Sequence, residues 1–240
     1  EVVDGRVPVI AGTGHFDTKT TIAQAKQAMT WGIDAALVVT PYYNKPNQEG
    51  LFQHFKAVFE ATGAPIVVYN VPGRTASDIL PETLARLVEI GAAIGVKDAT
   101  ANMTRTAQTL ATIGRDRSFA MLSGDDFTIL PFVACGGKGV VSVVSNLIPG
   151  DVSRLVKLTT QGALAEANPL NDRVISLSKT LFIDSNPIPV KAGMAMAGWC
   201  EPVHRLPLVP ATEAVRSAVQ ESVNAYRGQP ASASLQGFLS

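Results

Sequence analysis

The stretch that decides the fold is residues 65–100, which read PIVVYNVPGRTASDILPETLARLVEIGAAIGVKDAT. Its two ends, Pro65–Tyr69 and Ile94–Lys97, contain short apolar runs without alternation, which is typical of strands buried on both faces of a parallel sheet. Between them, Pro81–Glu89 has helical character. A strand, a helix and a second strand in this order form the unit that connects parallel strands.

The rest of the chain repeats this unit on both sides. Further strands are predicted at Val7–Ala11, Ala35–Val39, Phe119–Leu122 and Gly139–Val143. The intervening helices are predicted at Thr21–Thr30, Glu49–Thr62 and Thr104–Ile113. From about Pro149 onward the strand pattern stops, and helices are predicted at Asp151–Thr160, Ala163–Phe182, Pro189–Trp199 and Thr212–Tyr226.

Six such units fit either a barrel or a doubly wound sheet, and the ends of the strands distinguish the two. No GxGxxG fingerprint follows the first strand, which argues against a dinucleotide-binding sheet. Chemically capable residues end almost every predicted strand: Gly12–Gly14, Thr40–Tyr43, Tyr69–Asn70, Lys97–Asp98, Ser123–Asp126 and Ser145–Asn146. Polar residues at the carboxyl ends of many strands indicate the active-site face of a barrel.

We therefore predict an α/β fold of the TIM (β/α)8 barrel type. Residues 1–160 are expected to form a partial barrel of six strands, and residues 161–240 the last barrel helix with a C-terminal helical extension. The opening residues resemble the tail of a helix, with Gly5 near its C-cap, so we expect the barrel to lack its first two βα units.

The composition excludes several classes of partner. The 240 residues are 46% hydrophobic, and 20 Lys and Arg balance 20 Asp and Glu, which gives no electrostatic reason to expect nucleic acid or an anionic membrane. Cys135 and Cys200 form no CxxC spacing. No apolar run is long enough for a membrane span, and no signal segment opens the sequence, so we expect a cytoplasmic protein.

Lys97 is the strongest candidate for chemistry. It ends an otherwise apolar run, where burial of an ammonium is costly and favours the neutral amine that can attack a carbonyl. The alternative is a structural lysine that pairs with Asp98 or extends its ammonium to solvent. Because adjacent strand residues point to opposite faces, Asp98 is poorly placed as that partner.

Three other residues could act with such a lysine. Tyr69 ends the preceding strand and could relay protons, or it could be a core tyrosine with a satisfied hydroxyl. Tyr43 lies in a loop and could reach a site or a partner subunit. Arg74 follows a Val-Pro-Gly turn and could bind a substrate carboxylate, although a solvated loop arginine is the more common case.

Other candidates are weaker. Asp125 and Asp126 could suggest a metal, but the three histidines are scattered, and helix capping by one of these aspartates explains them better. Lys191, the rival amine, is expected in the first turn of a helix rather than at a strand end.

Five motifs together resemble the dihydrodipicolinate synthase (4-hydroxy-tetrahydrodipicolinate synthase) family. They are Thr40-Pro-Tyr-Tyr-Asn-Lys-Pro46, Tyr69-Asn-Val-Pro-Gly-Arg-Thr75, Gly95-Val-Lys-Asp-Ala-Thr100, Ser123-Gly-Asp-Asp126 and Asn186-Pro-Ile-Pro-Val-Lys191. The resemblance runs in order from Val7 to about Pro210. It implies a Schiff-base enzyme that condenses pyruvate with L-aspartate-4-semialdehyde, without a metal or an organic cofactor, in a homotetramer built from tight dimers.

The resemblance also implies a role for each site residue. Lys97 would form the imine with pyruvate, and Tyr69 would transfer protons beside it. Tyr43 would be a second relay tyrosine that crosses to the neighbouring subunit. Arg74 would bind the semialdehyde carboxylate. The last two substrate-binding positions are Val141, which would contact pyruvate through its backbone, and Gly124, which would play a smaller structural part.

The sequence departs from the family pattern in two respects. The threonine pair that relays protons in the family, in a Gly-Thr-Thr-Gly-Glu turn, has no counterpart. The missing stretch would hold the first two βα units, so this sequence alone is expected to be inactive or poorly folded, because two neighbouring strand edges would lie open. Phe16 and Thr20 stand where lysine-inhibited relatives have Asn and Glu, so feedback inhibition by lysine is not expected.

Two alternatives remain open. N-acetylneuraminate lyase and sugar-acid aldolases share the lysine and the first tyrosine, and Arg74 with the double tyrosine favours the synthase over them. A non-catalytic barrel that serves as a scaffold would fit a loss of strands, but the retained Lys97 and Tyr69 argue against it.

Overall fold

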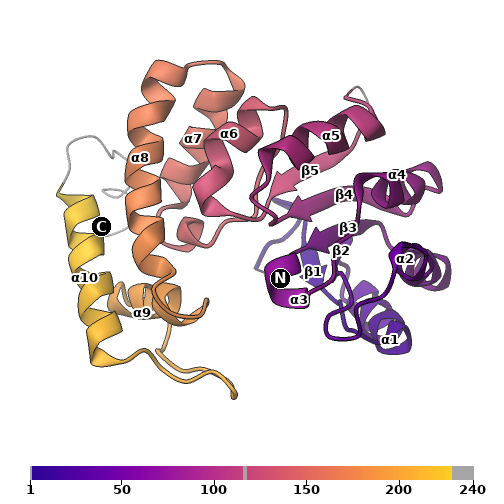
Figure 1. Cartoon of the computed structure of the whole chain (residues 1–240). Helices are drawn as coiled ribbons and strands as arrows, with labels where there is room; N and C mark the ends of the chain where they lie inside the picture. The colour runs from indigo at the N-terminus through magenta and orange to yellow at the C-terminus, as the bar shows by residue number, and fades with distance from the viewer. Residues whose placement is uncertain (1, 116–117, 229–240) are drawn as a thin grey trace. The chain divides into compact units, whose positions relative to one another are not determined.

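The computed structural model describes residues 2–115 and 118–228. Within these residues six strands form one sheet in the order β1-β2-β3-β4-β5-β6 (Figure 1). Neighbouring strands from β1 to β5 pair in parallel. The strands are β1 (Ile10–Gly12), β2 (Ala35–Val39), β3 (Ile66–Asn70), β4 (Ala93–Asp98), β5 (Ala120–Ser123) and β6 (Gly139–Val140). The parallel α/β fold is therefore confirmed, and the curled six-stranded sheet with its helices is consistent with the TIM-barrel type.

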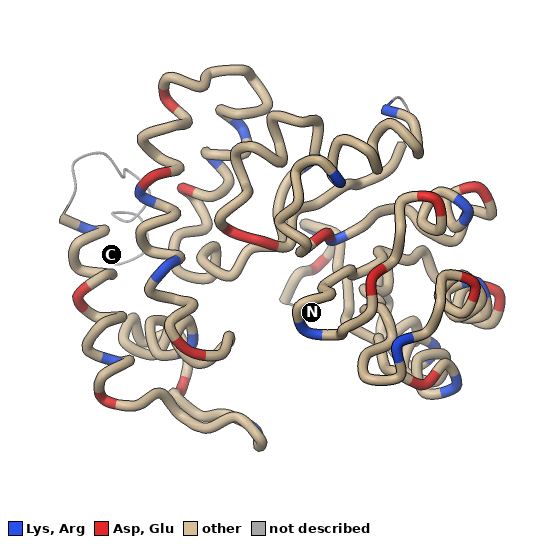
Figure 2. The backbone as a smooth tube through the Cα atoms, in the orientation of Figure 1, with Lys and Arg blue, Asp and Glu red and all other residues tan. Residues whose placement is uncertain are grey.

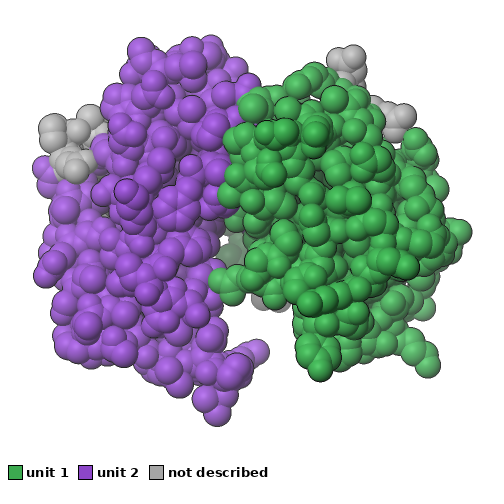
Figure 3. Space-filling model, in the orientation of Figure 1, with its two compact units in different colours: residues 1–124, 135–139 green, residues 125–134, 140–240 purple. Residues whose placement is uncertain are grey.

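The chain divides into two compact units (Figure 3). Unit 1 comprises residues 1–124 and 135–139, and unit 2 comprises residues 125–134 and 140–240. The helices of unit 1 are α1 (Thr18–Met29), α2 (Gln48–Thr62), α3 (Pro72–Thr75), α4 (Pro81–Glu89) and α5 (Met103–Ile113).

In unit 1, α1, α2, α4 and α5 cover one face of the curved sheet (Figure 1). The core lies beneath these helices, where Leu51 and Phe55 of α2 and Leu87 of α4 are fully buried. Val68 of β3 and Val96 of β4 are paired in register and are also buried. Because these apolar side chains must be buried, they determine which face of each strand the helices cover. The side chains that alternate with them point to the opposite face, which is the face available for a site.

The outer faces of these helices carry both signs of charge. Figure 2 shows Lys and Arg interspersed with Asp and Glu along α2 and α4, whereas α1 carries lysines and has Asp17 at its N-cap. Arg86 of α4 pairs with Glu49 of α2 at 2.9 Å, and its guanidinium lies 3.8 Å from the centroid of the Phe52 ring.

Unit 2 is helical apart from Val140, the second residue of β6. Its helices are η1 (Asp126–Thr128), α6 (Ile129–Ala134), η2 (Val144–Asn146), α7 (Pro149–Thr160), α8 (Leu164–Leu181), α9 (Ile188–Met196) and α10 (Glu213–Arg227). Buried residues of α7, α8 and α10 form its core, and Tyr226 donates a hydrogen bond of 2.6 Å to Asp151. The helices predicted between Asp151 and Tyr226 are present as α7 to α10, and the division of the chain at residue 160 stays a prediction.

Two local predictions were wrong. Residues 2–9 contain no helix; instead Asp4 (φ 48°) and Gly5 (φ 69°) form a left-handed turn. The strand predicted to reach Val143 ends at Val140. The carboxylate of Asp126 accepts hydrogen bonds from the backbone N–H groups of Val143 (3.1 Å) and Val144 (2.8 Å), which turns the chain into η2.

Among the described residues, no helix combines the length and the apolar character that crossing a bilayer requires.

Candidate active site

Lys97 and Tyr69 lie side by side at the carboxyl ends of two adjacent strands. They are directly paired in the β3–β4 register, and Lys97 Nζ lies 4.1 Å from the centroid of the Tyr69 ring. Both side chains are half-buried. An ammonium over a phenol face is stabilised by the ring quadrupole, so the register that burial imposes also brings these two groups together.

The electrostatic environment suits Tyr69 as a proton donor. Burial raises the pKa of the Tyr69 phenol, and the positive charge of Arg74 partly opposes that rise. The phenol therefore stays protonated at neutral pH and can donate a proton or accept one through its lone pairs.

Arg74 belongs to α3, the short helix that follows β3. Its side chain is exposed, and its charge acts on the Tyr69 phenol. Pro72 begins this helix, and the N–H of Arg74 donates to Val71 O at 2.9 Å. A guanidinium at this place is available to a carboxylate that enters from solvent.

Gly124 makes room for the stem of Lys97. A Cβ atom at this position would lie 3.1 Å from both Cγ and Cε of Lys97 and 2.8 Å from Cβ of Ala99. The N–H of Gly124 donates to Asp98 O at 2.7 Å, which holds the backbone of Gly124 against the end of β4.

Tyr43 extends into solvent from the loop between β2 and α2. Its side chain is 87% exposed, and its backbone adopts a left-handed conformation with φ 73°. The Tyr43 N–H donates to Thr75 O at 3.3 Å, which ties its loop to the end of α3. A large side chain in a disfavoured backbone conformation that points into solvent suggests a function outside the fold of its own chain.

The structure also shows where the other residues singled out from the sequence lie. Val141 belongs to unit 2 and is 36% exposed, and its role in binding pyruvate stays a prediction. Asp125 accepts from the Phe127 N–H at 3.3 Å at the start of η1, so the prediction of helix capping is confirmed. Burial raises the pKa of the Asp125 and Asp126 carboxyls. Lys191 lies in the first turn of α9, as predicted.

Asp98, the neighbour of Lys97, is buried and turned toward other groups. Its Oδ1 accepts from the Thr100 N–H at 2.8 Å, and its Oδ2 lies 3.9 Å from Nε of Arg105. Arg105 was not predicted from the sequence, because an arginine in a helix is usually solvated and only the folded chain brings it behind the strand ends.

Phe16 and Thr20, on which the prediction about lysine inhibition is based, both contact other residues of this chain. Phe16 packs against the Tyr42 ring, with centroids 5.5 Å apart. Thr20 donates through both its N–H and its hydroxyl to Asp17, at 2.8 Å each. Insensitivity to lysine stays a prediction.

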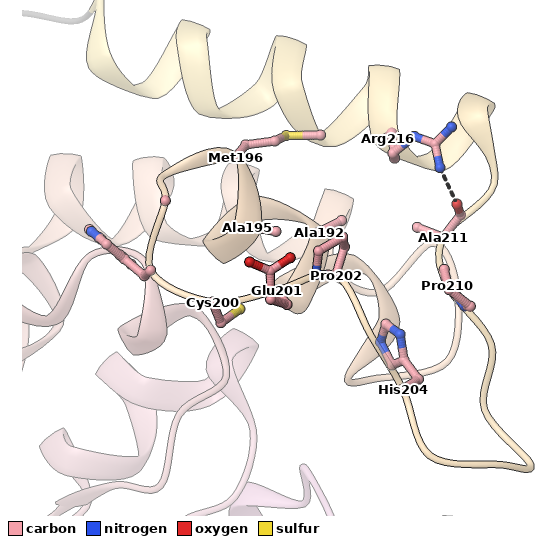
Figure 4. Close-up of a pocket in the computed structure, with 12 residues that line it drawn as sticks. Ala192, Ala195, Met196, Cys200, Glu201, Pro202, His204, Pro210, Ala211 and Arg216 are labelled. Atoms are coloured by element: carbon pink, nitrogen blue, oxygen red, sulfur yellow. Dashed lines mark hydrogen bonds between the residues drawn. The ribbon is translucent and has the colours of Figure 1, made fainter.

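A separate hollow lies in unit 2 (Figure 4). Its volume is about 540 Å³, and no residue predicted to be catalytic lines it. Arg216 crosses one end to donate to Ala211 O at 2.9 Å, and the His204 ring nitrogens are buried. The candidate site is therefore the group around Lys97 in unit 1.

Comparisons with known proteins point to one family. Residues 1–226 match the Dihydrodipicolinate synthetase family. The chain is 50% identical over 223 residues to the 4-hydroxy-tetrahydrodipicolinate synthase of Anaeromyxobacter sp. strain K, which covers 93% of this chain and 75% of that relative.

Solved structures agree with this result. The dihydrodipicolinate synthase of Thermotoga maritima superposes with a TM-score of 0.90 at 41% identity, covering 94% of this chain and 77% of that one. The chloride-inhibited synthase of Acinetobacter baumannii in complex with pyruvate gives a TM-score of 0.90 at 39% identity, covering 94% and 77%.

Proposed function

Because this chain belongs to the dihydrodipicolinate synthetase family, we propose that it is a 4-hydroxy-tetrahydrodipicolinate synthase of lysine and diaminopimelate biosynthesis. The reaction condenses pyruvate with L-aspartate-4-semialdehyde and releases water. The observation that carries the proposal is the position of Lys97 Nζ, 4.1 Å from the Tyr69 ring at the ends of two paired strands.

The chemistry begins on the Lys97 amine. After losing a proton, the amine attacks the keto carbon of pyruvate, and loss of water gives an imine. The imine withdraws electrons from the pyruvate methyl group, so loss of a proton there gives an enamine. The enamine carbon then bonds to the aldehyde carbon of the semialdehyde, whose oxygen takes up a proton. The amino group of the semialdehyde then attacks the imine carbon, which closes the ring, and the bond from that carbon to Lys97 breaks, so that the lysine amine leaves with a proton.

The surrounding residues serve these steps. Tyr69 is proposed to move protons at the imine, which its protonated phenol and its contact with Lys97 support. Arg74 is proposed to bind the semialdehyde carboxylate, which its exposed guanidinium beside Tyr69 supports. Gly124 leaves the space that the Lys97 stem occupies. Val141 is proposed to contact pyruvate through its backbone, on the strength of the family resemblance alone.

Tyr43 is proposed to serve the site of a neighbouring subunit in a homotetramer. Its high exposure and left-handed backbone support this role. Mixing a Tyr43→Phe variant with a Lys97→Arg variant tests it, because mixed dimers would contain one intact composite site. We expect activity to recover on mixing. A mixture no more active than the two separate variants would contradict the proposal that Tyr43 serves the neighbouring subunit's site.

We also propose that the barrel is completed by polypeptide beyond these six strands. This is supported by β1, which lies at an end of the sheet within the described residues.

We further propose that the protein works in the cytoplasm. This location is compatible with Cys135 and Cys200, which are both free thiols. Cell fractionation followed by immunodetection tests the location.

The aldehyde that reacts with the pyruvate adduct distinguishes a synthase from a sugar-acid aldolase. The chain is incubated with pyruvate, then with an aldehyde, and then with borohydride, and the pyruvate adduct is measured by mass spectrometry. We expect L-aspartate-4-semialdehyde to deplete the adduct and N-acetylmannosamine and glyceraldehyde to leave it unchanged. Depletion by the sugar aldehydes alone would assign the chain to the aldolases.

A further inference from the structure

Arg105 of α5 contacts acceptors on the segment that follows β3 and on the last residue of β4. Its side chain is only 14% exposed. Nη1 donates to Asp78 Oδ2 at 3.0 Å, Nη2 donates to the carbonyl of Ile79, and Nε lies 3.9 Å from Asp98 Oδ2. One planar guanidinium therefore donates hydrogen bonds to two acceptors, one of them negatively charged, and forms a longer ion pair with the Asp98 carboxylate.

Each of these acceptors either is the last residue of a strand or is hydrogen-bonded, directly or through its own residue's backbone, to the last residue of one. Asp78 Oδ1 accepts from Nδ2 of Asn70, the last residue of β3, at 2.8 Å. Asn70 Oδ1 accepts from the Ile79 N–H at 3.2 Å, which closes the ring of contacts. Asp98 is the last residue of β4. The guanidinium thus connects the end of β3 to the end of β4.

These strand ends are the ones that carry the proposed reacting groups. Asn70 directly follows Tyr69, and Asp98 directly follows Lys97, with both pairs in register across the two strands. Because successive strand residues point to opposite faces, Tyr69 and Lys97 share one face while Asn70 and Asp98 share the other. Arg105 reaches this second face from α5, one of the helices that cover it.

We propose that Arg105 is a positioning residue for the reaction. By holding Asp98, and through Asp78 also Asn70, it fixes the distance and orientation between Lys97 and Tyr69 on the opposite face. This inference rests on the proposed function, in which Lys97 is the amine that binds pyruvate.

The chemistry of the contact explains why arginine is required. Asp98 is 5% exposed, and loss of its cationic partner would leave a poorly solvated carboxylate at the end of β4. A lysine at position 105 would keep the charge but could not reach three acceptors in one plane. Displacement of a reacting group by about 1 Å can slow a reaction by roughly 100-fold.

The first test measures the rate at which pyruvate becomes trapped on Lys97 by borohydride. Arg105→Met is expected to lower this rate at saturating pyruvate by roughly 10- to 100-fold without changing the half-saturating pyruvate concentration. Arg105→Lys is expected to restore part of the loss. The matched control is Arg86→Met, which also removes a helical guanidinium that bridges an acidic partner. No loss in Arg105→Met, or an equal loss in Arg86→Met, would overturn the proposal.

The second test needs no substrate. Amide hydrogen exchange is compared at Ala99, whose N–H donates to Asn70 O at 2.9 Å, and at Gly124, whose N–H donates to Asp98 O at 2.7 Å. Arg105→Met is expected to speed exchange at both amides by roughly tenfold, while the Thr13 amide, bonded to Leu37 O at 3.0 Å, stays unchanged.

The two tests separate the two proposals. If the unaltered chain traps no pyruvate, the proposed function fails, and the exchange rates still decide whether Arg105 holds the strand ends. Uniform exchange across the three amides would overturn the role of Arg105. If Arg105→Met does not fold, Arg105→Lys supplies the same comparison.

Discussion

At the scale of single residues, Gly124 offers a steric test of the site. Its backbone lies outside the left-handed region, so Gly124→Ala introduces only a Cβ atom, placed 3.1 Å from Cγ and Cε of Lys97. We expect displacement of the lysine stem, a roughly 10- to 100-fold slower pyruvate adduct, and a destabilisation of about 1–3 kcal/mol. Trapping kinetics and urea unfolding measure the two effects.

The control for this change is Gly12→Ala. A Cβ atom at Gly12 would have nothing within 4 Å, so neither the trapping rate nor the stability should fall. Equal trapping rates in Gly124→Ala and the unaltered chain would show that the fit of Gly124 against Lys97 is unimportant.

His54 predicts a loss of stability in acid. It is 5% exposed, and its Nδ1 lies 2.9 Å from the Thr18 hydroxyl. Burial lowers the pKa of the imidazole from 6.5 to about 4, with Asp17 opposing the shift. Between these two values the unfolded chain binds a proton that the folded chain does not. Stability is therefore full above the unfolded value and falls as the pH drops toward 4, by on the order of 2–3 kcal/mol.

Urea midpoints measured between pH 7 and pH 4 test this expectation. In the His54→Gln variant, the urea midpoint should fall less steeply with decreasing pH than in the unaltered chain. In His15→Gln, at a less buried position, it should fall as steeply as in the unaltered chain. The same slope in His54→Gln as in the unaltered chain would rule out His54 as its source.

Individual residues differ in how far the sequence could predict them. Lys97 stood out because an ammonium at the end of an apolar run is costly, and Tyr69 stood out because it ends the preceding strand. Their contact depends on the register between β3 and β4, which the sequence does not state. Arg105 could not be predicted, because its partners Asp78 and Asp98 become neighbours only when α5 packs behind the strands.

At the scale of elements, the start of α5 affects the site more than the start of α10. Asn102 caps α5 by accepting from the Arg105 N–H at 3.0 Å, and Thr212 caps α10 by accepting from the Val215 N–H at 3.3 Å. Asn102→Ala and Thr212→Ala should each cost about 1 kcal/mol of stability. Only Asn102→Ala should also slow pyruvate trapping, because it loosens the turn that holds Arg105.

Thermal unfolding and trapping kinetics on both variants measure this difference. Slower trapping in both variants to the same extent would mean that lost stability alone sets the rate, and the special position of α5 would be refuted.

Element boundaries were predictable where local signals agreed. The predicted β2 and α4, Ala35–Val39 and Pro81–Glu89, match the structure at both ends. The end of β6 was mispredicted, because the apolar run Gly139–Val143 does not reveal that the Asp126 carboxylate takes the N–H of Val143. The turn at Asp4–Gly5 was mispredicted as a helix end, because a left-handed glycine fits both.

At the scale of the whole molecule, the edge of the sheet beside β1 is expected to limit activity. Within the described residues β1 pairs only with β2, and beside it Ile10 is 45% and Trp31 72% exposed. The hydroxyl of Thr13 is buried there without a hydrogen-bond partner among the described residues. Such an edge favours self-association.

We therefore expect this sequence, expressed alone, to condense pyruvate and the semialdehyde at least roughly 100-fold more slowly than the Anaeromyxobacter relative. Light scattering should detect association beyond the proposed tetramer, and a Trp31→Ser variant should reduce it. A turnover rate within about tenfold of that relative would contradict the need for further strands.

Borohydride reduction in the presence of pyruvate, followed by peptide mass spectrometry, shows whether the Lys97 amine condenses with pyruvate. We expect one reduced pyruvate adduct, located on Lys97, absent in Lys97→Arg and retained in Lys191→Arg. An adduct on Lys191 or on surface lysines, with Lys97 unmodified, would contradict it.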